Sequence, residues 1–167
     1  MTLTRTSRRA FVIAIAIFIL DQLVKWWVIG PLNLEAVRQV EVLPFFNFTW
    51  VENRGISFGL FTAGSDAARW LLTGVTAIIA TGVAIWITRE KQWGDQAALS
   101  LVLGGALGNI VDRARFGYVV DYADLHFGDF RPFLVFNIAD AAISIGIVIL
   151  LLRAFFAPAP KEKKSDA

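Results

Sequence analysis

The chain of 167 residues contains no cysteine and a single histidine. The absence of cysteine excludes disulfide bonds, thiolate metal ligands and a cysteine nucleophile. One histidine without cysteine also makes a poor zinc site. Charge is scarce as well, because 18% of the residues are charged, whereas soluble domains contain about 25%. With 56% hydrophobic residues, the composition is typical of a membrane protein.

The hydrophobic residues form four blocks, each about as long as a helix that crosses a bilayer. The blocks cover residues of about 11–30, 67–88, 97–113 and 135–156. We therefore expect an all-α integral membrane protein with four transmembrane helices, and residues 1–156 as one polytopic domain. Residues 157–167 are rich in proline and then in charge, which predicts a disordered tail.

The distribution of basic residues predicts how the chain crosses the membrane. Nine of the sixteen Lys and Arg residues lie in the N-terminal tail, in a short loop near 89–95 and at the C-terminal end. By the positive-inside rule, both termini face the cytoplasm, and the longer segments 31–66 and 116–134 face outward. Because these basic residues are topology signals, no nucleic-acid partner is expected. The segment 31–66 mixes β-branched and aromatic residues in partial alternation, which predicts short strands on the membrane surface.

Two groups of polar residues lie inside the predicted spans, where a charge costs about 2.5–3.5 kcal/mol on insertion scales. Asp21 and Lys25 are spaced i, i+4 on the first span. They are either a self-neutralising pair, with Lys25 extending to the outer interface, or a support for the fold or the substrate. Asn109, Asp112 and Arg113 share one face of the third span. For Asp112 we expect a structural network in which the neighbouring Arg113 offsets its charge.

Gly104 and Gly108 form a G-x-x-x-G pattern in the third span. Small residues at this spacing let a second helix approach closely in a membrane. The pattern therefore predicts helix packing.

Asp121 and Asp140 are expected at similar depth near the outer surface. Asp140 lies about 7–8 Å into the fourth span at the helical rise, without a basic residue close to it in the sequence. Asp121 follows the third span and should lie at or just beyond the outer boundary. Two adjacent carboxyls share a proton, which supplies an acid and a base for aspartic proteolysis. Similar residues also serve proton- or ion-coupled transport, which stays open at this point.

The segment GISFG at 55–59 matches the nucleophile-elbow pattern G-x-S-x-G, which would suit a membrane serine hydrolase that uses Ser57. An elbow needs a buried strand before it and a helix directly after it. GISFG follows VENR and precedes the turn-like LFTAGSD, so we expect an ordinary role for Ser57. Two further hypotheses are a small transporter, for which no inverted repeat is visible, and a structural subunit in which the polar residues only pack.

Five blocks of the chain resemble the bacterial lipoprotein signal peptidases, the signal peptidase II family. They are DQLVK at 21–25, ENRGISFG at 52–59, GGALGNIVDR at 104–113, GYVVDY at 117–122 and FNIADAAISIG at 136–146. The resemblance implies an aspartic endopeptidase of the bacterial inner membrane. Such an enzyme cleaves diacylglyceryl-modified prolipoproteins just before the lipidated cysteine, at the outer face of that membrane.

The resemblance also implies roles for individual residues. By position in the motifs, Asp121 and Asp140 are the catalytic pair. The residues that match the family around the site, for substrate binding or support, are Asp21, Asn53, Gly55, Gly108, Asn109, Asp112, Arg113 and Asn137.

The resemblance further implies a small β-rich outer (periplasmic) cradle between the first two spans, and no metal or organic cofactor. The expected partners are prolipoprotein substrates, membrane lipid and inhibitors of the globomycin type, and the expected state is a monomer. The chain departs from the family at Ser57, where a small residue such as Ala is common. It also varies before FNIAD, so we assign no role to Asp124, His126 or Asp129.

Overall fold

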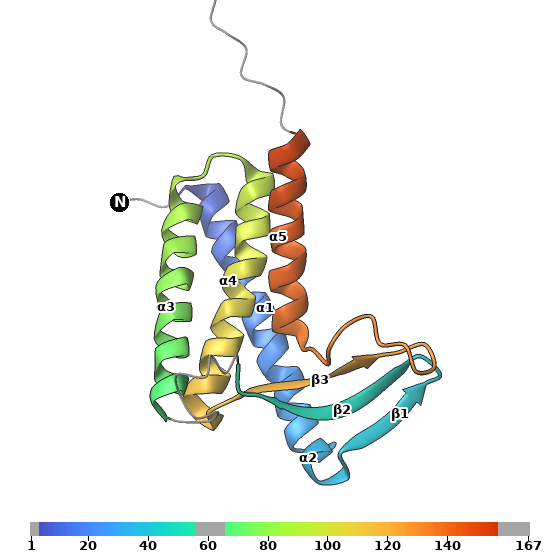
Figure 1. Cartoon of the computed structure of the whole chain (residues 1–167). Coiled ribbons are helices and arrows are strands. Elements are labelled where there is room, and N and C mark those ends of the chain that lie inside the picture. The colour runs from blue at the N-terminus through green and yellow to red at the C-terminus, as the bar shows by residue number, and fades with distance from the viewer. Residues whose placement is uncertain (1–3, 56–65, 157–167) are drawn as a thin grey trace, which may run out of the picture.

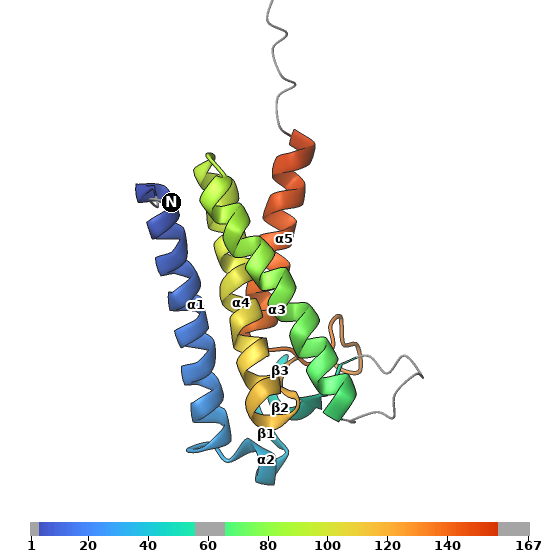
Figure 2. The same ribbon diagram turned by 90° about the vertical axis from the view of Figure 1, so that its left-hand side faces the viewer.

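The computed structural model describes residues 4–55 and 66–156. Four long helices lie side by side, and a small sheet projects sideways from one end of them (Figures 1 and 2). The helices are α1 (Arg5–Ile29), α3 (Asp66–Arg89), α4 (Trp93–Phe116) and α5 (Ile138–Phe156). All four are long and apolar enough to cross a membrane. The predicted fold class is therefore confirmed, while the charged tail at 157–167 lies outside the described residues.

The helix α4 lies at the centre of the bundle and packs against each of the other three helices. In its most apolar stretch 56% of the residues are buried, against 17–22% in α1, α3 and α5. The other three helices therefore present most of their apolar side chains outward, as helices surrounded by lipid do. The interior of the molecule is therefore formed around α4. The polar residues predicted for the third span lie on this helix.

Glycines on α4 allow this close packing. A Cβ added at Gly104 would collide with the carbonyl oxygen of Ala14 on α1, and one at Gly108 would collide with the carboxylate of Asp21. Gly105 faces the other way and meets the backbone of Ala139 on α5. The close approach predicted for Gly104 and Gly108 is therefore observed, with α1 as the partner.

The sheet has three antiparallel strands in the order β1-β2-β3. A short helix α2 (Leu34–Val37) leads into the hairpin of β1 (Gln39–Leu43) and β2 (Phe46–Asn53). These are the strands expected in the segment 31–66. The third strand, β3 (Val119–Leu125), comes from the segment after α4, which the sequence predicts only as an outer loop. The cradle is therefore built from both outer segments.

Two connections fix β3 between α4 and α5. Gly117 ends α4 in the left-handed conformation, with φ of 86°, which residues other than glycine rarely adopt. At the other end, the N–H of Ala123 donates to the carbonyl oxygen of Phe136 at 2.8 Å, and the N–H of Phe136 donates back at 3.0 Å. The start of α5 is thereby joined to β3, which places Asp121 next to the first turn of α5.

We predict that Gly104→Ala lowers the Tm of the detergent-solubilised protein, because the added methyl group forces α1 away from α4. Overpacking of this kind costs about 1–3 kcal/mol. The matched control is Gly82→Ala in α3, where an added Cβ would meet nothing within 4 Å. Its Tm should equal or exceed that of the wild type, because alanine favours helix. Equal Tm values for the two variants would contradict the packing described here.

Candidate active site

Asp121 is buried in β3 and its two carboxylate oxygens each accept a hydrogen bond from an asparagine. Its exposed fraction is 1%. The side-chain amide of Asn53 donates to Oδ2 at 3.0 Å, and that of Asn137 donates to Oδ1 at 2.6 Å. Asn53 reaches Asp121 because β2 pairs Val51 with Asp121, so that Asn53 lies diagonally across on the same face of the sheet.

Asp140 lies in the first turn of α5, directly after the helix begins. Asn137 precedes the helix, and its Oδ1 accepts the backbone N–H of Asp140 at 2.8 Å. Oδ2 of Asp140 accepts the N–H of Asn137 in return, at 3.4 Å. This is a capping box, which fixes both side chains at the helix start. Asn109 on α4 donates to Oδ1 of Asp140 at 2.8 Å.

Asn137 is therefore the residue that joins the two predicted carboxylates. It is fully buried. Its side-chain nitrogen donates to the carboxylate of Asp121, its backbone N–H donates to the carboxylate of Asp140, and its side-chain oxygen accepts the backbone N–H of Asp140. The capping pattern of FNIAD is visible in the sequence, and it is the signal that could have identified this role. The arrangement gives each of the four carboxylate oxygens an N–H donor.

The environment of Asp121 brings the pKa of its carboxyl close to neutral pH. Burial, followed by the negative charge of Asp140, raises the pKa of Asp121 from its ordinary value to about 7. The hydrogen bonds from Asn53 and Asn137 and the charge of Lys25 act in the opposite direction, because they favour the ionised carboxylate. Near pH 7 this carboxyl can therefore either accept or donate a proton.

Lys25 lies between two carboxylates in the interior. Its Nζ is 2.9 Å from Asp21 and 2.6 Å from Asp112, and all three side chains are at most 2% exposed. The predicted salt bridge between Asp21 and Lys25 is therefore confirmed. The alternative in which Lys25 extends to the outer interface is wrong, since burial between two acids satisfies its charge. Asp112 interacts electrostatically with Arg113, as expected, but its ion pair is made elsewhere. Among the described residues its salt bridge is made with Lys25, and not with the adjacent Arg113.

Arg113 supplies positive charge beside the aspartates. Its guanidinium interacts electrostatically with Asp140, Asp121 and Asp112, in decreasing order. Its Nε is buried and has no hydrogen-bond partner among the described residues. Sequence position alone does not predict this neighbour of Asp140, because the two residues lie on different helices and meet only in the folded chain.

Gly55 has a φ of 82°, and its N–H donates to the side-chain oxygen of Asn53 at 3.0 Å. It thereby orients the amide that binds Asp121. Residues 56–59 of the GISFG segment, Ser57 included, lie outside the described residues.

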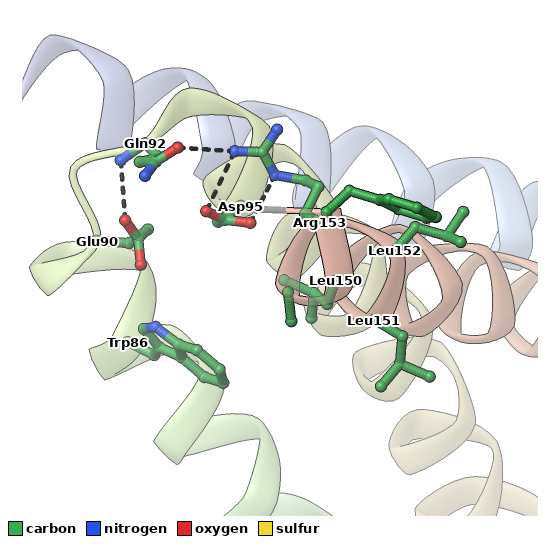
Figure 3. A pocket seen from close by; sticks show the side chains of 10 residues that line it. Trp86, Glu90, Gln92, Asp95, Leu150, Leu151, Leu152 and Arg153 are labelled. Carbon is green, nitrogen blue, oxygen red and sulfur yellow. Dashed lines mark hydrogen bonds and ion pairs between the residues drawn. The ribbon is translucent and has the colours of Figure 1, made fainter. Parts of the chain in front are cut away.

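A cavity of about 240 Å³ opens beside Asp140, lined by Phe133, Phe136, Asp140, Ala141, Ser144 and Ile145. A larger cavity of about 770 Å³ lies at the opposite end of the bundle, between α3 and α5. Figure 3 shows that Arg153 there binds Asp95 and Gln92, with Nε of Arg153 2.7 Å from Asp95. No predicted site residue lines the larger cavity, so the smaller one is the candidate substrate site.

Comparison with known proteins decides the family. The sequence model of the family described as signal peptidase (SPase) II matches residues 13–156. The chain belongs to the signal peptidase II family. It is 57% identical to the lipoprotein signal peptidase of Sphingopyxis alaskensis, over 88% of this chain and 85% of that relative. It is 54% identical to that of Rhizorhabdus wittichii, over 90% and 88% of the two chains.

A solved structure described as a bacterial membrane enzyme also resembles this signal peptidase II. Its TM-score is 0.79 at 28% identity, and the match covers 100% of this chain and 99% of that one. The predicted family, and with it a protease of a multi-pass membrane fold, is confirmed. The roles of the individual site residues stay predictions, for which the geometry above supplies the physical basis.

We predict that Asn53→Ala raises the pKa of Asp121, because the variant loses a hydrogen bond that favours the ionised carboxylate. A ¹³C NMR titration of labelled aspartate carboxyls measures this change. Thr49→Val is the matched control, since Thr49 on the same strand donates to Asp124 at 3.2 Å instead. An Asn53→Ala protein in which Asp121 titrates at or below the wild-type pH would contradict the assignment.

Proposed function

We propose that this signal peptidase II removes signal peptides from diacylglyceryl-modified prolipoproteins, with Asp121 and Asp140 as its catalytic pair. The family membership and the names of the relatives support the reaction. The observation that carries the site is that Asn137 donates to both carboxyls, to Asp121 from its side-chain amide and to Asp140 from its backbone N–H. The half-buried Asp140 opens onto a cavity, so substrate can reach the pair from the membrane side.

The chemistry follows from one proton shared by two carboxyls. The ionised carboxyl takes a proton from a water molecule, and the oxygen of that water attacks the scissile carbonyl carbon. The protonated carboxyl donates its proton to the carbonyl oxygen, which gives a neutral tetrahedral intermediate. When the C–N bond breaks, the protonated carboxyl donates its proton to the leaving amine nitrogen, and the ionised carboxyl takes a proton from a hydroxyl group of the intermediate. The products are a carboxylic acid and an amine, and the pair again holds one proton. Because the two groups titrate as one unit, neither is assigned a fixed protonation state.

Three asparagines orient the two carboxyls for these steps. Asn53, Asn109 and Asn137 donate to carboxylate oxygens at 3.0, 2.8 and 2.6 Å. An amide has no titratable proton in this pH range, so it orients a carboxyl without competing for the shared proton. Arg113, which interacts with both aspartates, offsets part of the negative charge of the site.

The position of the site suits a lipidated substrate. Asp140 lies in the first turn of α5. That end of α5 is next to the sheet, where the outer leaflet would meet the bundle (Figure 1). The cavity runs from Asp140 along α5 past Ser144 to Ile145, so an apolar part of the substrate could remain in lipid while the scissile bond meets the pair. Globomycin-type inhibitors would compete for this same site.

The arrangement in the membrane is also part of the proposal. Arg5 at the start of α1, the turn after Arg89 and the end of α5 at Arg153 all lie at the end of the bundle opposite the sheet (Figure 1). This supports cytoplasmic termini and an outward-facing sheet, by the positive-inside rule. We place the enzyme in the bacterial inner membrane, as a monomer.

We predict that Asp121→Asn and Asp140→Asn each lower kcat by about 100- to 10,000-fold, the range for loss of a general acid or base. The measurement is cleavage of a diacylglyceryl-modified prolipoprotein in detergent and lipid. Asp124→Asn is the matched control, because Asp124 lies on the same strand, is 2% exposed and pairs with Arg131. It should keep most of the activity.

Substantial turnover by either Asn variant of the pair would overturn the catalytic assignment. Ser57→Ala tests the serine-hydrolase hypothesis in the same assay. It should cleave like the wild type, and a folded but inactive Ser57→Ala protein would restore that hypothesis.

A further prediction concerns the lipid. The same precursor without its diacylglyceryl group should show a higher KM, because its apolar contacts with the membrane and the cavity are lost. Equal kcat/KM values for the two precursors would contradict recognition of the lipid.

A further inference from the structure

Two buried carboxylates, one for each member of the Asp121–Asp140 pair, bind the backbone N–H of the residue that directly precedes that aspartate. Oδ2 of Asp112 accepts the N–H of Val120 at 3.2 Å, and Val120 directly precedes Asp121. Oδ1 of Asp21 accepts the N–H of Ala139 at 3.1 Å, and Ala139 directly precedes Asp140. A separate contact thus holds each half of the pair, one residue away from the carboxyl itself.

Lys25 and Gln22 join these two carboxylates to each other. Nζ of Lys25 is 2.9 Å from Asp21 and 2.6 Å from Asp112. Nε2 of Gln22 donates to Asp21 at 3.2 Å and to Asp112 at 3.0 Å. The result is a continuous chain of polar contacts from Val120 on β3, through α4 and α1, to Ala139 on α5.

We propose that Lys25, Asp21, Asp112 and Gln22 form a positioning cluster that sets the separation of the Asp121 and Asp140 carboxyls. The proposal rests on the catalytic pair proposed above. Asp121 belongs to a strand and Asp140 to a helix, so a rigid secondary-structure element does not by itself fix their spacing. The cluster adds a second constraint to the backbone hydrogen bonds between β3 and Phe136, because it binds both backbones and is joined by Lys25 and Gln22.

Burial makes the cluster stiff and makes Lys25 necessary. In a low-dielectric interior an ion pair is strong, while an unpaired charge is costly. Without Lys25, Asp21 and Asp112 would repel one another or become protonated, and a protonated carboxyl is a weaker acceptor for a backbone N–H. Either response loosens the contacts to Val120 and Ala139, and so allows β3 and the start of α5 to shift.

We expect Lys25→Met to lower kcat about 100-fold, the cost of a displacement of about 1 Å in a catalytic group. KM should change little, because no cluster residue lines the cavity beside Asp140. The matched control is Arg153→Met, which removes a cation paired with Asp95 at the other end of the bundle. That variant should retain the wild-type kcat.

Gln22→Leu weakens the cluster without a change of charge. If Lys25→Met does not fold, this variant alone tests whether the cluster positions the two carboxyls. If the carboxyls move apart, Asp140 raises the pKa of Asp121 less, so the alkaline limb of the kcat/KM profile shifts to lower pH. A role in stability alone would lower Tm and leave this limb in place. The expected result is a reduced kcat together with the shifted limb.

The inference is overturned if Gln22→Leu keeps the wild-type kcat and pH profile, or if a folded Lys25→Met protein keeps its kcat. Asp121→Asn, assayed in parallel, separates the two levels of the proposal. An inactive Asp121→Asn protein beside an active Lys25→Met protein rejects only the positioning cluster. An active Asp121→Asn protein rejects the catalytic pair as well.

Discussion

The salt bridges of Lys25 with Asp21 and Asp112 are the interaction on which the rest of the site depends. Charges in the interior of a membrane protein are tolerated only where they are paired, and here the pairing joins α1 to α4. Asp21 binds the backbone of Ala139 through its other oxygen, Oδ1, while Oδ2 of Asp112 accepts the N–H of Val120 in addition to its contact with Lys25. Because buried charges must be neutralised, Lys25 brings Asp21 and Asp112 together, and these two acids help to hold β3 and α5 next to each other.

The carboxyl of Asp121 is also buried, but no cation forms a salt bridge with it among the described residues. Asp121 is buried as deeply as the Lys25 cluster but is bound by neutral amides. Burial and the charge of Asp140 therefore raise its pKa, and the amides only partly oppose them. Asp21 and Asp112 are thus paired with a cation, whereas Asp121 is kept near its titration point. This contrast separates support from chemistry among side chains that look alike in the sequence.

The features that could be predicted from the sequence are those encoded locally. The four helices follow from the lengths of the apolar blocks, and the hairpin follows from alternation in 31–66. The salt bridge of Lys25 with Asp112 and the strand β3 could not be predicted in this way, because each depends on segments that meet only in the folded chain. For that reason the sequence suggests Arg113, rather than Lys25, as the partner of Asp112. The capping box of FNIAD is local, and could have shown that Asn137 fixes Asp140 at a helix start.

The titration of the Asp121 carboxyl in the wild type and in Asp140→Asn is the most direct test of the shared proton. ¹³C NMR of labelled aspartate in the detergent-solubilised enzyme measures it. We expect Asp121 to titrate near 7 in the wild type, and at lower pH in Asp140→Asn, because the neighbouring negative charge is gone. An Asp121 carboxyl that titrates at the same pH in both proteins would show that the two groups do not share a proton, and would contradict the catalytic pair proposed here.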